Sequence, residues 1–305
     1  MKTSTRRFFS DILNHCYQRT VNRGLLFYSV TDFLVLFTIV CVNAVRFGIK
    51  VYALCFMPDH IHGSYSTFNK RDLSGFVRCY TSEYATSFNA VCHRAGPLFA
   101  CRFGSAPKIG DKKARTNIVY VNNNPVERRI TKKAEDYRWN FLAYATSDHP
   151  YSEPIINRRI SKNMKQAMAA VKNLHSKGLP VKHAFLKHWF GLLNKKESKQ
   201  FADFIINTYN IIDYKEAARF FGGFDNMITA LHSTTGSEYD LNEITEGRDD
   251  SCFSKMGSLL LNNGLVNDIH EIVAMNSDGK MNLLRFLSGK TEATPAQIAK
   301  FLHFE

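Results

Sequence analysis

The alternation of apolar and polar positions in the first half of the chain predicts a mixed α+β unit. Apolar residues between positions 73 and 88 recur every three to four residues, as on the buried side of a helix. Short runs of β-branched and aromatic residues, bounded by turn residues, predict strands. The predicted elements, in chain order, are a strand over 15–21, a helix over 31–44, a hairpin over 50–66, a helix over 72–93, a strand over 98–103 and a helix over 114–123. This order predicts an antiparallel sheet of the ferredoxin-like type with helices, followed by a mostly α-helical C-terminal region.

Prolines, glycines and charge divide the chain into three segments. Pro150 and Pro154 end the α+β unit, which we assign to residues 1–150. Residues 151–200 are predicted to form a basic helical connector, and residues 201–305 a domain of short helices separated by glycines.

The end of the chain, over residues 281–302, resembles a helix-turn-helix. Thr294 is expected to cap the second helix, and Pro295 stands at its first position, where a missing N–H is tolerated. An ordinary helical hairpin is the alternative, because helix pairs are common and this part of the chain is acidic.

Charge is distributed unevenly over a chain whose 45% hydrophobic and 13% aromatic residues indicate a globular protein. The net charge is +13, yet residues 1–150 carry +11, residues 151–200 carry +9 and residues 201–305 carry −7. A polyanionic partner for the first two hundred residues follows from this distribution, and a solvated basic face is the alternative.

The seven cysteines contain no Cys-x-x-Cys pair and lie mostly in apolar runs. They predict reduced, buried thiols in a cytoplasmic protein rather than a disulfide framework or a zinc site. The most apolar run, over 33–45, is too short to span a bilayer, and no secretory signal is expected at the start of the chain. We therefore expect a buried helix and no membrane partner.

Two histidines, His60 and His62, follow the predicted turn at Pro58 and Asp59. Because alternate residues of a strand share a face, both imidazoles project from one side of the hairpin while Ile61 enters the core. Two imidazoles so placed can share one metal ion. A pair of neutral surface histidines is the alternative.

A second set of polar residues lies downstream, on the predicted helix over 114–123 and just beyond it. If the helix continues, Tyr120 and Asn124 lie four residues apart on one face, so that a phenol nucleophile and a carboxamide ligand reach the same metal. Pro125 is expected to disfavour helical geometry at Asn124. Tyr80 and Tyr84 are alternative tyrosines, but they lack the Asn-Pro-Val sequence that follows Tyr120.

Together these motifs resemble those of the single-tyrosine HUH transposases, specifically the REP-associated tyrosine transposases and their insertion-sequence-200-like relatives. The resemblance covers about the first half of the chain. It rests on His60-Ile61-His62, on Tyr120 with Asn124-Pro125-Val126, and on short runs in the same order that begin at His15, Gly96 and Tyr137.

The resemblance implies the same ferredoxin-like fold and a metal-dependent enzyme that cleaves and rejoins DNA. Tyr120 would be the nucleophile that forms a 5′-phosphotyrosine intermediate, and His60, His62 and Asn124 would hold Mg²⁺ or Mn²⁺. Many relatives have glutamine at the position of Asn124. The implied substrate is single-stranded DNA that forms a hairpin. Some relatives act as homodimers, and the sequence leaves both a monomer and a homodimer open.

Basic residues near these motifs are the expected contacts to DNA phosphates, and Tyr17, Phe99 and Phe103 are candidates for stacking on unpaired bases. The basic residues are Arg19, Arg23, Arg102, Lys112, Lys113 and Arg115. Two other functions compete with a transposase or nuclease. One is a catalytically silent, sequence-specific DNA-binding regulator, and the other is a role of the acidic C-terminal half as a module that binds a protein partner.

Overall fold

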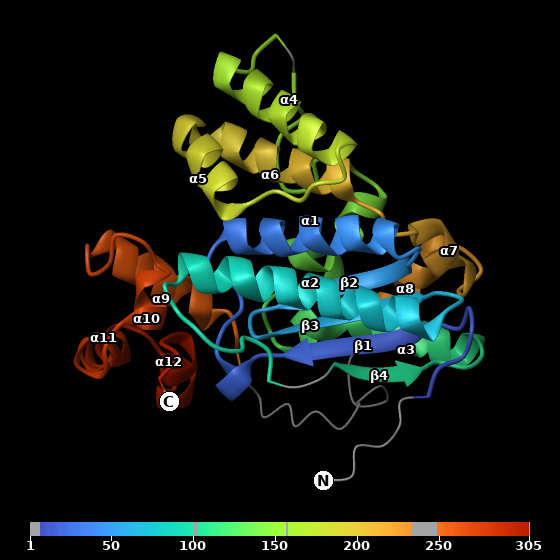
Figure 1. Cartoon of the computed structure of the whole chain (residues 1–305), viewed down its shortest axis with the longest axis horizontal. Helices are drawn as coiled ribbons and strands as arrows, with labels where there is room; N and C mark the ends of the chain where they lie inside the picture. Colours follow the sequence, from blue (N-terminus) through green and yellow to red (C-terminus); the bar gives the residue numbers. More distant parts are fainter. Residues whose placement is uncertain (1–6, 101–102, 157, 234–248, 305) are drawn as a thin grey trace.

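The computed structural model describes residues 7–100, 103–156, 158–233 and 249–304. Its centre is a four-stranded antiparallel sheet (Figure 1) in the order β2-β3-β1-β4. The strands are β1 (Asn14–Arg19), β2 (Lys50–Met57), β3 (His60–Ser66) and β4 (Gly104–Pro107). With α1 between β1 and β2 and α2 between β3 and β4, this is the ferredoxin-like order, so the predicted α+β fold class is confirmed.

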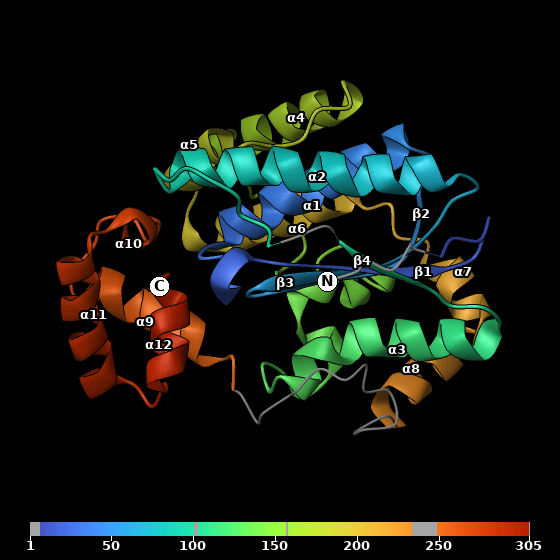
Figure 2. The ribbon, with the colours of Figure 1, turned by 60° about the horizontal axis from the view of Figure 1, so that its bottom comes forward.

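Helices cover both faces of the sheet (Figure 2). One face carries α1 (Val30–Arg46) and α2 (Lys70–Val91), and the other carries α3 (Asp111–Glu127). The predicted helices over 31–44 and 72–93 and the hairpin over 50–66 are confirmed. Ile61 lies in the hydrophobic core between the sheet and α1 and α2, as the alternation along the strand predicts.

The predicted strand over 98–103 does not coincide with a strand of the described residues, which contain an isolated antiparallel bridge between Thr20 and Phe99; residues 101 and 102 lie outside the described part. Leu98 and Ala100 make single backbone hydrogen bonds at the end of β1, but the regular ladder with β1 begins at Gly104, opposite Tyr17. Leu98 is buried, and a buried apolar residue need not belong to a paired strand. The strand that the structure contains, β4, has the sequence Gly-Ser-Ala-Pro and lacks the β-branched and aromatic residues that predict strands.

The expectation that Pro125 turns Asn124 out of the helix is also wrong. Both residues lie within α3, which continues to Glu127. Pro125 stands in the last turn of the helix, so its missing N–H removes one hydrogen bond near an end where the helix soon stops. The backbone N–H of Arg128 still bonds to the carbonyl of Asn124 at 3.1 Å.

A further helical layer, formed by α4 (Lys162–Ser176), α5 (His183–Leu192) and α6 (Lys195–Tyr209), packs on α1 (Figure 1). Two shorter helices, α7 (Tyr214–Arg219) and α8 (Phe224–Ser233), lie against β2 and α3. The short 3₁₀ turns are η1 (Val21–Arg23), η2 (Ala134–Asp136), η3 (Arg138–Asn140) and η4 (Leu142–Ala145).

The last described segment forms α9 (Cys252–Asn262), α10 (Glu271–Ala274), α11 (Ser277–Lys290) and α12 (Pro295–Phe301), beside one end of the sheet (Figure 2). The predicted cap of α12 is confirmed. The Thr294 hydroxyl accepts a hydrogen bond from the Gln297 N–H, and the Gln297 side chain accepts one from the Thr294 N–H.

A buried carboxylate on α1 joins three distant parts of the chain. Asp32 Oδ1 accepts hydrogen bonds from His183 Nε2 at 2.9 Å and from His270 Nε2 at 2.8 Å. Its other oxygen accepts from the backbone N–H groups of Tyr28 and Ser29. Burial alone raises the pKa of Asp32, but the two histidines outweigh burial and hold that pKa well below its usual range.

Among the described residues, no helix combines the length and the apolar character that a membrane crossing requires. Of the six described cysteines, Cys16, Cys41, Cys55 and Cys92 are buried. Cys101 lies outside the described residues.

Candidate active site

Polar side chains of α3 meet polar side chains of β3 in order along both elements. The helix crosses the strand so that positions three or four residues apart on α3 face alternate residues of β3. The pairs are Asn117 with Ser64 (2.7 Å between Oδ1 and Oγ), Tyr120 with His62 (5.2 Å between ring centroids) and Asn124 with His60 (3.4 Å between Oδ1 and Nε2). The structure therefore brings the two histidines, the tyrosine and the asparagine together, as their spacing predicts.

The His60 ring is held by its neighbour Asp59. Nδ1 of His60 lies 2.6 Å from Oδ1 of Asp59, and an ionised carboxylate only accepts hydrogen bonds, so Nδ1 carries the proton. Burial alone raises the pKa of Asp59, yet His60 and then Lys300 outweigh it and keep the carboxylate ionised. The Nε2 atom of His60 is left facing Asn124.

The His62 ring is held by His15 on the adjacent strand. Nδ1 of His62 lies 3.0 Å from Nε2 of His15, and the two rings are stacked. Burial lowers the pKa of His15 to about 3, and burial, followed by the neighbouring His60, lowers the pKa of His62. In both rings burial thus favours the neutral form. Nε2 of His62 is buried and has no hydrogen-bond partner among the described residues.

These donor atoms fit a divalent metal. In each histidine the Nδ1 atom is occupied by a neighbouring side chain, which leaves Nε2 as the ligand atom, the usual arrangement at metal-bound imidazoles. His60 Nε2 and Asn124 Oδ1 are 3.4 Å apart. Two atoms that share one ion at about 2.1 Å are roughly 3.0–3.5 Å apart. The buried Nε2 of His62 would be a ligand of the same ion.

In the part of the chain that the structure describes, no three His, Cys, Asp or Glu side chains converge as a metal site requires. The Asn124 amide, whose Oδ1 lies 3.4 Å from His60 Nε2, is a further candidate ligand. Imidazole and amide ligands together suit Mn²⁺ better than Mg²⁺, since Mg²⁺ prefers oxygen throughout.

Tyr120 lies edge-on to both neutral imidazoles, with ring centroids 5.2 Å from His62 and 5.5 Å from His15. Its side chain is buried, and it comes from the same chain as the histidines. Tyr80 and Tyr84 are on α2, on the opposite face of the sheet, and Tyr84 donates its hydroxyl to the carbonyl of Leu26. Among these three tyrosines, Tyr120 is the one beside the histidine pair.

The basic residues predicted to contact DNA lie in different surroundings. Arg19 is opposite His60 in the sheet and its guanidinium lies 6.0 Å from the centre of the Tyr17 ring. Arg23 is exposed, as are Lys112 and Lys113 in the first turn of α3. Arg115 donates a hydrogen bond to the Phe220 carbonyl at 3.0 Å. Arg102 is outside the described residues.

Other residues join this site without having been assigned to it from the sequence. His15 and Asp59 orient the two histidines, and Lys300 reaches Asp59 from α12. His15 was predictable in part, because the strand places it on the same face as His62, whereas Lys300 has no local signal. Asp250 is buried 4.0 Å from Arg128, and burial raises its pKa.

Comparison with solved structures gives a distant similarity. No model of a known protein family matches the chain, and no curated protein matches it. A solved structure described as a REP-associated tyrosine transposase bound to a REP hairpin is similar over 47% of this chain and 84% of that chain, with 16% identity and a TM-score of 0.42. At this level of similarity the function has to be argued from the site itself.

Proposed function

We propose that this protein is a metal-dependent enzyme that cleaves and rejoins single-stranded DNA through a tyrosine nucleophile. The observation that carries the proposal is the contact of the Tyr120 ring with His62, next to two imidazoles whose Nε2 atoms are available as metal ligands. A tyrosine beside a metal that neutralises phosphate charge is the arrangement needed for attack on a phosphodiester.

In the proposed reaction the Tyr120 oxygen attacks the scissile phosphorus and loses its proton to solvent. The bond from phosphorus to the 3′ oxygen breaks, and the leaving oxygen takes up a proton to become a 3′-hydroxyl. The product is a 5′-phosphotyrosine ester, which conserves the energy of the phosphodiester. A 3′-hydroxyl can therefore reverse the step and join new ends without ATP.

Each residue of the site has a part in this reaction. His60, His62 and Asn124 would hold the divalent ion, which supplies charge neutralisation at the phosphate oxygens. A phenol has a reference pKa of about 10 and is mostly protonated at neutral pH, so the site would also have to lower the free-energy cost of ionising Tyr120. Arg19, opposite His60 in the sheet, would contact a phosphate of the bound strand.

The substrate we propose is single-stranded DNA that forms a hairpin, as the resemblance of the motifs implies. The proposed site is complete within one chain, because the histidines and Tyr120 already contact one another there. A catalytically silent DNA-binding regulator would use the same fold without the tyrosine, and the experiment below distinguishes the two.

The test is covalent capture of labelled DNA. Purified protein is incubated with 5′- or 3′-labelled single-stranded hairpin oligonucleotides from repeats near its gene, with Mn²⁺ or Mg²⁺, and run on a denaturing gel. We expect an adduct that carries the 3′ portion of the DNA, disappears with a chelator and disappears in Tyr120→Phe. Tyr80→Phe, a buried tyrosine on the opposite face, is the matched control. Binding without an adduct would favour the regulator.

A further inference from the structure

Helix α12 and the residues that follow it pack against the segment after β1, which is far from them in sequence. The His303 ring lies over Gly24, where a Cβ atom would be 2.5 Å from the ring, and His303 Nε2 donates to the Leu25 carbonyl at 3.0 Å. The Tyr28 hydroxyl donates to the Phe301 carbonyl at 2.8 Å. These contacts fix the position of α12 relative to the sheet.

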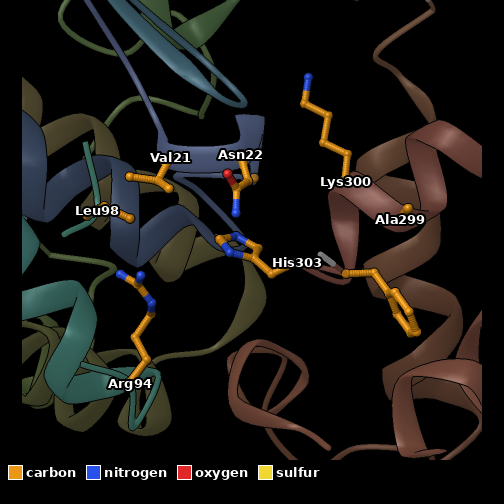
Figure 3. A pocket seen from close by; sticks show the side chains of 9 residues that line it. Val21, Asn22, Arg94, Leu98, Ala299, Lys300 and His303 are labelled. Carbon is orange, nitrogen blue, oxygen red and sulfur yellow. The ribbon is translucent and has the colours of Figure 1, made fainter. Parts of the chain in front are cut away.

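A small cavity of about 40 Å³ marks this junction (Figure 3). His303 points from the end of α12 toward Asn22, and Arg94 approaches from the other side. Lys300, one turn earlier, also lines the cavity, and its side chain extends in a different direction from that of His303. The cavity has room for a few water molecules. The contact that reaches the candidate metal site is the one made by Lys300.

Lys300 reaches the turn of the hairpin. Its Nζ atom lies 2.7 Å from Oδ2 of Asp59, and both side chains are nearly buried, at 13% and 11% exposure. The other oxygen of the same carboxylate, Oδ1, lies 2.6 Å from Nδ1 of His60. One carboxylate thus joins a lysine of the last helix to a histidine of the candidate metal site.

Because Lys300 and His60 bind different oxygens of Asp59, the carboxylate is restrained at both ends. A carboxylate held at one oxygen can rotate about that contact, whereas a carboxylate held at both oxygens has a fixed plane. A fixed plane at Asp59 fixes the orientation of the His60 ring and keeps the proton on Nδ1. Nε2 is then directed toward Asn124, at 3.4 Å.

We propose that Lys300 is a positioning residue of the candidate metal site, acting through Asp59 on His60. The inference rests on the metal site of the proposed function but not on the DNA chemistry. It gives the C-terminal helices a role within the chain, because α12 completes the surroundings of a site whose ligands all lie in the first 124 residues.

The experiment measures Mn²⁺ binding alone, by isothermal titration calorimetry on the full-length protein without DNA. Loss of a residue that orients a metal ligand typically weakens binding by 10- to 100-fold. We expect Lys300→Met to raise the Kd for Mn²⁺ by about tenfold or more, and Lys300→Arg to stay within about threefold of the parent. Lys290→Met, an exposed lysine at the end of α11, is the matched control.

A double-mutant cycle separates positioning from a general effect on stability. Asp59→Asn should weaken Mn²⁺ binding by a similar factor, and adding Lys300→Met to it should weaken binding no further, because the path through Asp59 is already broken. Additive losses, or an unchanged Kd in Lys300→Met with only a lower melting temperature, would overturn the proposal. If Lys300→Met does not fold, Lys300→Gln is measured by the same criteria.

The two proposals fail in different ways. If DNA is captured covalently but the Mn²⁺ affinity does not depend on Lys300, the proposed enzyme is supported and the positioning role of Lys300 is overturned. If the Mn²⁺ affinity depends on Lys300 but no DNA is captured covalently, the positioning role is supported and the proposed enzymatic activity is overturned. A parent protein that binds no Mn²⁺ overturns the metal site and, with it, the role of Lys300.

Discussion

The stacked imidazoles of His15 and His62 are joined by a hydrogen bond of 3.0 Å between neighbouring strands. Both rings are held neutral by burial, so this bond also decides which nitrogen of His62 faces the site. We expect His15→Leu to leave Nδ1 of His62 without its partner and to weaken Mn²⁺ binding by about tenfold. His149→Asn, outside the site, should leave the Kd unchanged when both are measured by calorimetry; equal values in the two variants would contradict the role of His15.

The Asp32 cluster predicts a strong dependence of stability on one carboxylate. Replacing Asp32 with asparagine removes the charge that faces His183 and His270, and breaking a buried ion pair in this way costs about 3–5 kcal/mol of unfolding free energy. Urea unfolding monitored by circular dichroism measures the loss. Asp225→Asn, an exposed acid on α8, should cost less than about 1 kcal/mol. A small effect at Asp32 would show that the cluster is not an ion-pair network.

His270 predicts how stability changes at alkaline pH. Burial lowers its pKa, but Asp32 and Asp268 outweigh burial and raise that pKa from the ordinary 6.5 to about 9. The stabilisation is therefore fully present below pH 6.5 and is lost as the pH rises through about 9. We expect the unfolding free energy of the parent to fall by on the order of 2 kcal/mol over this window and that of His270→Gln to fall less. Parallel curves for the two proteins would contradict the assignment.

Adding a methyl group at Gly24 tests how closely the chain packs where α12 meets the segment after β1. Its φ of −62° suits any residue, so the backbone does not require glycine there. A Cβ atom would instead meet the His303 ring at 2.5 Å, and such overpacking typically costs about 1–3 kcal/mol. We expect Gly24→Ala to destabilise the protein and to speed amide exchange in α12. Gly191→Ala, which meets nothing within 4 Å in α5, should be neutral or stabilising by up to about 1 kcal/mol.

The basic connector predicts a salt-dependent contact with nucleic acid. All eleven of its lysines and arginines are exposed, while Glu197 is buried and Glu153 is paired with Lys196. We expect the triple change of Lys162, Lys165 and Lys172 to glutamine to reduce the slope of log binding constant against log salt for single-stranded DNA by up to about 2. Changing Lys255 and Lys290 to glutamine is the control. An unchanged slope would leave the connector as a solvated basic surface.

Local chemistry made much of this fold predictable. The hairpin follows from its β-branched and aromatic strands around Pro58 and Asp59, and α12 follows from Thr294 and Pro295. The placement of Tyr120 and Asn124 beside the histidines follows from the period of the helix. In each case, residues close in sequence carry the information.

The features that the sequence could not predict depend on contacts between distant segments. Strand β4 contains no β-branched residue, and Gly104 is suited to it because the Tyr17 ring lies where a side chain at Gly104 would be. The contact of Lys300 with Asp59 has no signature in either neighbourhood, since a lysine on a short helix is normally a solvated charge. Such pairs become visible only once the fold is known.

The cluster around Asp32 also sets an order of events during synthesis. The ribosome releases α1 long before it releases His183, and later still His270, so the Asp32 carboxylate is made well before both of its imidazole partners. The two partners follow Asp32 by 151 and 238 residues. The contacts that neutralise this carboxylate therefore form only after segments far downstream of α1 have been synthesised.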